Sequence, residues 1–163
     1  MPTLPLSPHV AGLVSRIDLS TLYPPMLDRY LATVANCAQR NADYFAISAG
    51  RDLIQQQVIW ESGRELQNGV WVVVDETKVR TKAKPGFSAH NYLVAIDSSR
   101  DKNAEVKGLQ PDWEFESYRT LAEEGQKVGL EAAFFWTTFP EGPHLQLPLG
   151  RYGLFVGALK ILH

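Results

Sequence analysis

The sequence has few side chains that could bind a metal ion, and their types point to one metal. Of the four histidines, His9 lies in a proline-rich start and His163 is the last residue, which leaves His90 and His144 inside expected structure. Asp97 follows shortly after His90. Two imidazoles and a carboxylate suit zinc, and a catalytic zinc site keeps three protein ligands with one position open for water. His90, Asp97 and His144 together supply such a ligand set. Taken alone, however, a histidine near a strand is more often a hydrogen-bonded structural residue than a metal ligand.

Two expected strands would position these ligands. In the run 144–147 polar and apolar residues alternate, so a strand would direct His144 and Gln146 toward one face and both leucines toward the core. A strand at 93–96 would carry Asp97 at its end, on the face of Leu93 and Ala95, and opposite Val94 and Ile96. Two such strands could bring Asp97 and His144 to one surface.

The other elements predict an α+β fold, with helices beside a small sheet. Helical spacing of apolar residues follows Pro24 up to about Arg40, and a short buried strand is expected at 44–48. A second helix, capped by Asp52, should end near Ser62. A β-prone run covers 71–74, and a third helix is expected at 115–128.

Composition excludes several classes of protein. Hydrophobic residues make up 45% and charged residues 21% of 163 residues, which is typical of one globular domain and not of a disordered chain. The net charge of −2 provides no basic field for nucleic acid, so we expect no nucleic-acid partner. Cys37 is the one cysteine, so no intramolecular disulfide can form, and we interpret it as a small buried apolar residue.

The start of the chain has no pattern of a secretory signal, and no apolar run reaches the length that spans a membrane. We expect synthesis in the cytoplasm, no insertion into a membrane, and a monomer. Prolines suggest an extended arm at 1–16, followed by a single domain at 17–163. We expect no separate domain that binds the cell wall.

Two motifs carry a resemblance to a known family. The segment 88–97, Ser-Ala-His-Asn-Tyr-Leu-Val-Ala-Ile-Asp, resembles the S-x-H-N-Y-G-x-A-x-D signature of zinc D-alanyl-D-alanine carboxypeptidases and phage L-alanyl-D-glutamate endolysins, the VanY-like, LAS-type metallopeptidases. The segment 141–144, Glu-Gly-Pro-His, resembles their second motif, E/D-x-x-H. Leu93 stands where the first motif has glycine, and Phe135 stands where the family often has a polar residue.

The resemblance implies roles for individual residues. In the family the two histidines and the aspartate bind zinc, which transfers that role to His90, Asp97 and His144, and the acidic residue three positions before the last histidine is the general base, here Glu141. A further stretch resembles the family pattern S-G-x-R…Q…G-R. That pattern assigns substrate binding and oxyanion stabilisation to Arg51, and adds Gln56 and Ser88 as substrate-binding residues. The implied fold is the LAS and hedgehog-like one, with a small antiparallel sheet that carries the zinc site between flanking helices.

Simpler roles compete with these assignments. Glu141 could be a solvated turn residue, and Arg51 could merely pair with a carboxylate at a helix start. Ser88 could be a turn hydroxyl. Four aromatic residues are expected to form core and cleft wall and not a sugar platform, namely Trp113, Phe134, Phe135 and Trp136.

The function that the resemblance implies is zinc-dependent hydrolysis of peptidoglycan. We expect an endolysin of a bacteriophage that cuts the L-alanyl-D-glutamate bond of stem peptides, reaching the cell wall in the periplasm after the inner membrane is permeabilised. Two alternatives remain open: a D-alanyl-D-alanine carboxypeptidase or dipeptidase, and a non-catalytic, zinc-stabilised module that binds murein. The intact Glu141 argues against the last.

Overall fold

The computed structural model describes residues 17–102 and 110–148, and their centre is an antiparallel sheet. The strands follow the order β1-β4-β7-β6, and β5 pairs with β4. Their bounds are Tyr44–Ser48 for β1, Ala95–Asp101 for β4, Pro111–Asp112 for β5, Glu131–Ala132 for β6 and His144–Gln146 for β7. The α+β class with a small antiparallel sheet is thus confirmed.

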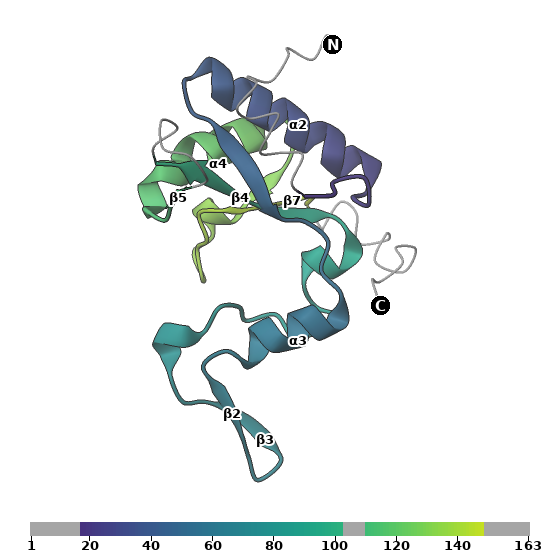
Figure 1. The fold of residues 1–163 in the computed structure, drawn as a ribbon, viewed down its shortest axis with the longest axis vertical. Coiled ribbons are helices and arrows are strands. Elements are labelled where there is room, and N and C mark those ends of the chain that lie inside the picture. The colour runs from purple at the N-terminus through teal and green to yellow at the C-terminus, as the bar shows by residue number, and fades with distance from the viewer. Residues whose placement is uncertain (1–16, 103–109, 149–163) are drawn as a thin grey trace.

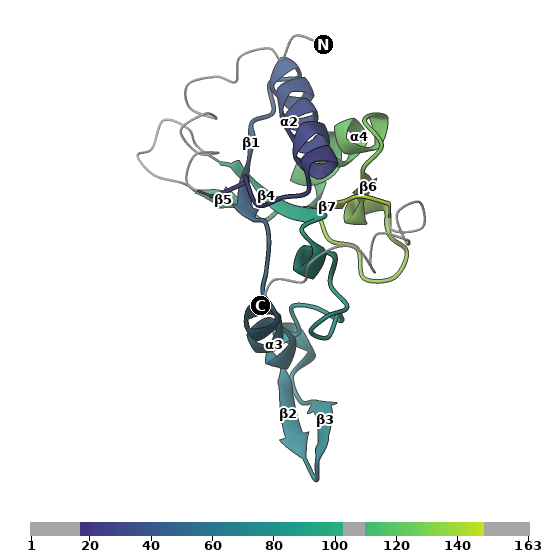
Figure 2. The ribbon, with the colours of Figure 1, turned by 90° about the vertical axis from the view of Figure 1, so that its right-hand side faces the viewer.

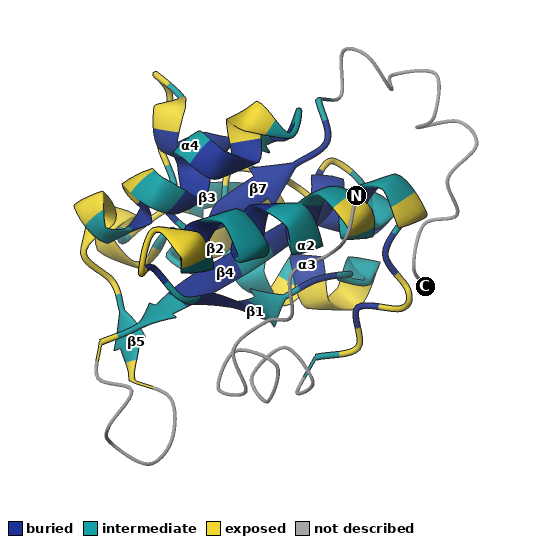
Figure 3. Ribbon diagram, turned by 90° about the horizontal axis from the view of Figure 1, so that it is seen from above, coloured by how far each residue is buried: buried dark blue, intermediate teal, exposed yellow. Residues whose placement is uncertain are grey.

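Two helices cover one face of this sheet (Figure 1). They are α2, Pro24–Gln39, and α4, Arg119–Lys127, which pack against each other. Pro24 occupies the first turn of α2, where its missing N–H leaves no helical hydrogen bond unmade. Tyr30, Val34 and Cys37 form part of a fully buried stripe on α2. Figure 3 shows the buried strands below the two helices. The core therefore lies between the sheet and these helices, as the helical spacing indicated.

The helix α3 and a two-stranded hairpin lie on the other side of the sheet (Figures 1 and 2). The helix α3, Leu53–Glu61, begins at Asp52, whose carboxylate accepts the N–H of Gln55, while the Gln55 side chain accepts the N–H of Asp52. This reciprocal pair satisfies two free donors at the helix start. The hairpin strands β2, Arg64–Gln67, and β3, Val70–Val73, pair with each other and project outward.

Within residues 17–102 and 110–148, four short 3₁₀ helices complete the connections. They are η1 at Glu76–Lys78, η2 at Ala89–Tyr92, η3 at Phe115–Tyr118 and η4 at Ala133–Phe135. The third helix expected from the sequence therefore starts as a 3₁₀ turn before α4 begins.

One predicted strand needs correction, and one strand was not predicted. The strand expected at 93–96 begins at Ala95 and runs on to Asp101, because Leu93 adopts a left-handed conformation with φ of 64° that ends η2. That conformation costs a residue with a side chain about 1 kcal/mol, and glycine adopts it freely, which explains the glycine in the motif that Leu93 departs from. The strand β2 was not predicted, because its residues are mostly polar and exposed and show no apolar alternation.

The arm expected at 1–16 and the end of the domain lie outside the described residues, so these bounds stay predictions. Among the described helices none has the length and apolar character needed to cross a membrane.

Candidate active site

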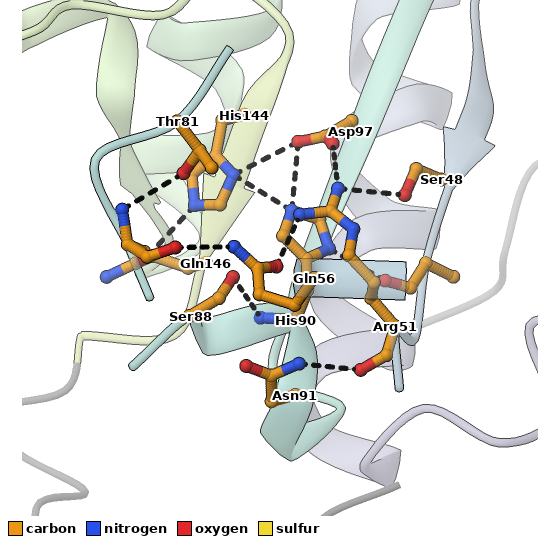
Figure 4. A network of polar contacts seen from close by, with 12 residues as sticks. Ser48, Arg51, Gln56, Thr81, Ser88, His90, Asn91, Asp97, His144 and Gln146 are labelled. Atoms are coloured by element: carbon orange, nitrogen blue, oxygen red, sulfur yellow. Dashed lines mark hydrogen bonds and ion pairs between the residues drawn. The ribbon is translucent and has the colours of Figure 1, made fainter. Parts of the chain in front are cut away.

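Three elements bring the expected metal ligands together. Asp97 on β4 and His144 on β7 are directly paired across the sheet, and His90 comes from η2 (Figure 4). Oδ1 of Asp97 lies 3.0 Å from Nδ1 of His144 and 3.1 Å from Nε2 of His90. One ligand atom from each residue lies within 4.8 Å of the others, so the three could hold one metal ion.

The outward nitrogen of each imidazole is fixed by an acceptor. Nδ1 of His90 lies 2.7 Å from the carbonyl oxygen of Ala49, which can only accept, so this nitrogen carries the proton. Nε2 of His144 lies 2.9 Å from Oε1 of Gln146 and donates to it. The lone pairs of both rings therefore point toward Asp97, as the rings of metal-binding histidines do when an outer acceptor sets their tautomer.

This arrangement fits zinc. Nε2 of His90 and Nδ1 of His144 face each other at 3.2 Å, and both side chains are almost completely buried. Two lone pairs at that distance repel unless a proton or a cation lies between them. Two imidazoles and one carboxylate form the donor set of an open zinc site.

Charge is concentrated at Asp97. Burial opposes its ionisation, yet the two imidazoles hold the pKa of Asp97 well below its ordinary value. Burial also opposes the charged form of His144, but Asp97 would accept a hydrogen bond from the protonated ring and so raises the pKa of His144 overall. The cluster is thus built around the negative charge of Asp97, whose side chain is partly exposed, and that charge attracts a cation.

Arg51 is held beside the cluster by three acceptors. Its guanidinium donates to Oε1 of Gln56 at 2.8 Å, and lies 3.4 Å from Oδ2 of Asp97 and from Oγ of Ser48. The backbone N–H of Arg51 also donates to the carbonyl of His90. Arg51 therefore pairs with a carboxylate, as its simpler role required, and at the same time lines the cavity over the cluster.

Gln56 has a different place from the one expected. It is fully buried, its Nε2 donates to the carbonyl of Ala83, and its Oε1 accepts from Arg51. Since both halves of the amide are bonded within the chain, the structure speaks against direct contact with a substrate. We therefore propose Gln56 as a residue that positions Arg51.

Ser88 is the N-cap of η2, where its Oγ accepts the N–H of His90, and it also lines the cavity. Its turn role is thus present, and its contact with substrate stays a proposal.

Glu141 enters the same cavity from the loop before β7. The cavity has a volume of about 740 Å³ and is lined by all three cluster residues together with Glu141. Burial raises the pKa of Glu141 above its ordinary value, although the charge of His144 opposes this. Next to it, Gly142 packs so closely on Tyr118 that an added Cβ would lie 2.7 Å from the ring. The tight turn therefore fixes Glu141 relative to His144.

The side chains behind His144 include groups that were not expected to take part in the site. Gln146 also donates, at 3.5 Å, toward Oε2 of Glu131, and Oε1 of Glu131 accepts the indole N–H of Trp136 at 2.7 Å. Strand alternation had already placed Gln146 on the face of His144, which was the one available signal. Trp136 and Trp113 line the cavity, in agreement with the expected cleft wall.

Comparisons with known proteins agree with this fold. Residues 20–142 match the family VanY, described as D-alanyl-D-alanine carboxypeptidase. No curated protein matches the sequence. One similar solved structure is the L-Ala D-Glu endopeptidase ChiX of Serratia marcescens, at 14% identity and a TM-score of 0.56, covering 93% of this chain and 95% of that one.

A second similar structure is a zinc-bound mutant of the vancomycin-resistance D,D-pentapeptidase VanY from a VanB-type cassette. It has 16% identity and a TM-score of 0.57, and the match covers 85% of this chain and 80% of the other. The expected fold, the enzyme class of zinc metallopeptidase and the zinc cofactor are therefore confirmed. The chain belongs to the VanY family of D-alanyl-D-alanine carboxypeptidases.

Proposed function

We propose that this zinc peptidase cuts the L-alanyl-D-glutamate bond of peptidoglycan stem peptides as an endolysin. The observation that supports hydrolysis most directly is that His90, Asp97 and His144 open into one cavity together with Glu141 and Arg51. The similarity to ChiX over nearly the whole of both chains is compatible with the proposed bond.

The residues divide the chemistry among them. His90, Asp97 and His144 would hold zinc, which when bound supplies Lewis acidity. Glu141 takes a proton from the attacking water and returns it to the leaving amine, and burial, which raises the pKa of Glu141 above its ordinary value, makes it a stronger base. Arg51 stabilises the negative charge that develops on the carbonyl oxygen. The bonds to Gln56 and Asp97 hold the guanidinium ready for that role.

Removal of the base tests this division. Glu141→Gln preserves shape and removes basicity, so we expect hydrolysis of purified peptidoglycan to fall about 10²- to 10⁴-fold while fold and bound zinc are kept. The hydrolysis rate is measured by the release of new amino termini, and bound zinc is measured by metal analysis. A variant that cleaves at the parent rate would place the base elsewhere, and a variant that loses zinc would make Glu141 a ligand.

A second candidate is a D-alanyl-D-alanine carboxypeptidase, which the description of the matched family favours. Mass spectrometry of digested muropeptides separates the two. Cleavage before D-glutamate separates L-alanine from the rest of the stem, whereas the carboxypeptidase releases only the terminal D-alanine.

A non-catalytic module that binds murein is the candidate from another class. Such a module has no need of a carboxylate in the cavity, whereas Glu141 lines it with an altered pKa. Equal binding of murein by the parent and by Glu141→Gln, with no cleavage by either, would support this candidate.

The setting of host lysis is part of the proposal and is supported by the resemblance to phage endolysins. Production of the protein inside a bacterial host should lyse the cells only when the inner membrane is also opened, as judged by culture turbidity.

A further inference from the structure

One wall of the cavity carries two basic residues that the chemistry above does not use. Arg80 and Lys82 lie in the segment between η1 and η2, and both line the cavity that contains the His90 cluster. Thr81, which lies between them, also lines it (Figure 4). Both basic side chains are exposed. They are therefore available to a molecule that enters the cavity.

These two cations have no acidic partner among the described residues, in contrast to their neighbour Lys78, whose Nζ lies 3.0 Å from Asp75. Nζ of Lys82 instead lies 5.1 Å from the ring centroid of Phe139, in the loop before Glu141. A cation over an aromatic face is attracted to it and keeps its remaining N–H donors free. Lys82 is thus held at the cavity without being neutralised.

The acidic groups of the cavity do not offset these charges. Asp97 and Glu141 are the two carboxylates among the lining residues, and Asp97 already pairs with Arg51 and both histidines. Glu141 transfers protons in the proposed function, so it does not serve as an ion-pair partner for Arg80 or Lys82. Bound zinc would add further positive charge. The cavity therefore has an excess of unpaired positive charge on the Arg80 wall, which attracts anions.

We propose that Arg80 and Lys82 bind a carboxylate of the substrate, so that the cavity selects peptides with a free carboxylate near the scissile bond over peptides in which it is amidated. This inference rests on the proposed function and specifies its substrate class. A guanidinium can grip a carboxylate with two parallel hydrogen bonds, and an adjacent ammonium adds a point charge. An amide offers neither the charge nor two equivalent acceptors.

The test compares an acidic stem peptide with its amidated analogue. Binding of each to zinc-loaded Glu141→Gln protein, which should not turn over, is measured by calorimetry at low and high salt. The Glu141→Gln protein should bind the acidic peptide more tightly than the amidated one. When Arg80→Gln and Lys82→Gln are added to it, the ratio of the two affinities should fall toward one. Because two exposed ion pairs are removed, we expect this ratio of affinities to fall about tenfold. High salt should reduce the same ratio.

Lys78→Gln is the matched control, because it removes a cation of the same region that is paired and does not line the cavity. It should leave the ratio as in the parent. A double variant with an unchanged ratio, or a Lys78 variant with an equal loss, would overturn the inference. Failure of the proposed function has a different signature: the zinc-loaded parent then binds neither peptide and releases no fragment from murein.

Discussion

The two histidines of the cluster differ in how their outward nitrogens are held. Nδ1 of His90 donates to a backbone carbonyl, which mutation of Ala49 would leave in place, whereas Nε2 of His144 donates to the side chain of Gln146. The tautomer of His144 thus depends on one replaceable residue. Glu131 in turn orients the Gln146 amide by accepting from its Nε2.

Loss of the Gln146 amide should weaken zinc binding. In Gln146→Leu the outward nitrogen of His144 loses its acceptor, so the tautomer with a free Nδ1 is no longer favoured, and we expect zinc affinity to fall about 10- to 100-fold. Competition with a chelating dye measures it. Gln57→Leu on α3, where the amide bonds Glu61, is the control and should bind zinc as the parent does. Equal affinities in both variants would show that Gln146 does not position His144.

Replacement of Arg51 should affect turnover more than metal binding. The guanidinium contacts Asp97 at 3.4 Å but is not itself a zinc ligand, so Arg51→Ala should lower kcat about 10²- to 10³-fold while zinc is kept. Steady-state kinetics and metal analysis on the same preparation separate the two effects. A fully active Arg51→Ala variant would show that Arg51 only forms a structural ion pair with Asp97.

Among the helices, α2 and α4 are joined at one end by a buried carboxylate. Glu124 on α4 is 4% exposed and accepts from Arg40, beyond the end of α2, at 2.8 Å and from Lys127 at 2.6 Å. Burial opposes its ionisation, but the two cations lower the pKa of Glu124 below its ordinary value. A lowered pKa in the folded state contributes stability at any pH above the ordinary carboxyl pKa, and that stability is lost as the pH falls through the folded value.

Glu124→Gln should therefore destabilise the protein in a pH-dependent way. We expect a loss of about 1–2 kcal/mol in the free energy of unfolding near neutral pH, and a smaller loss in acid, where the parent carboxyl is protonated. Urea titrations at both pH values measure this. Glu123→Gln removes the other, more exposed partner of Arg40 and should change stability little. Parallel pH profiles of parent and Glu124→Gln would contradict the assignment.

Across the whole molecule, the metal cluster ties η2 to two central strands of the sheet. His90 comes from η2, Asp97 from β4 and His144 from β7, so a bound ion links segments that are far apart in sequence. A ligand that binds only the folded state stabilises it in proportion to the logarithm of its concentration over Kd. The fold and the metal should therefore be thermodynamically coupled.

Removal of zinc should lower the melting temperature. At a zinc concentration of about 100 Kd the stabilisation is about 2.7 kcal/mol, and it should disappear with a chelator. Metal analysis should give one zinc per chain. In His90→Ala the chelator should have no further effect, which serves as the control. If the melting temperature of the parent protein changes neither with chelator nor with added zinc, the proposed metal site is contradicted.

The sequence by itself determined the local elements and the chemical types at the site. A proline at the start of α2, the reciprocal cap at Asp52 and the alternation around His144 are short-range signals, and each was present in a few adjacent residues. The motifs around His90 and Glu141 likewise named the groups that the structure brings into one cavity. The polar strand β2 and the left-handed Leu93 had no comparable local signal.

Only the tertiary structure decided how these groups meet. The pairing of Asp97 with His144, the burial of Gln56 behind Arg51 and the placement of Arg80 on the cavity wall join segments far apart in the chain. Strand register across such separations is set by the packing of one whole face against the core, and a slip of one residue would turn every side chain to the other face. No short stretch of sequence contains the many weak interactions that make up this packing. The outer hydrogen-bond partners of the metal ligands could therefore be identified only from the tertiary structure.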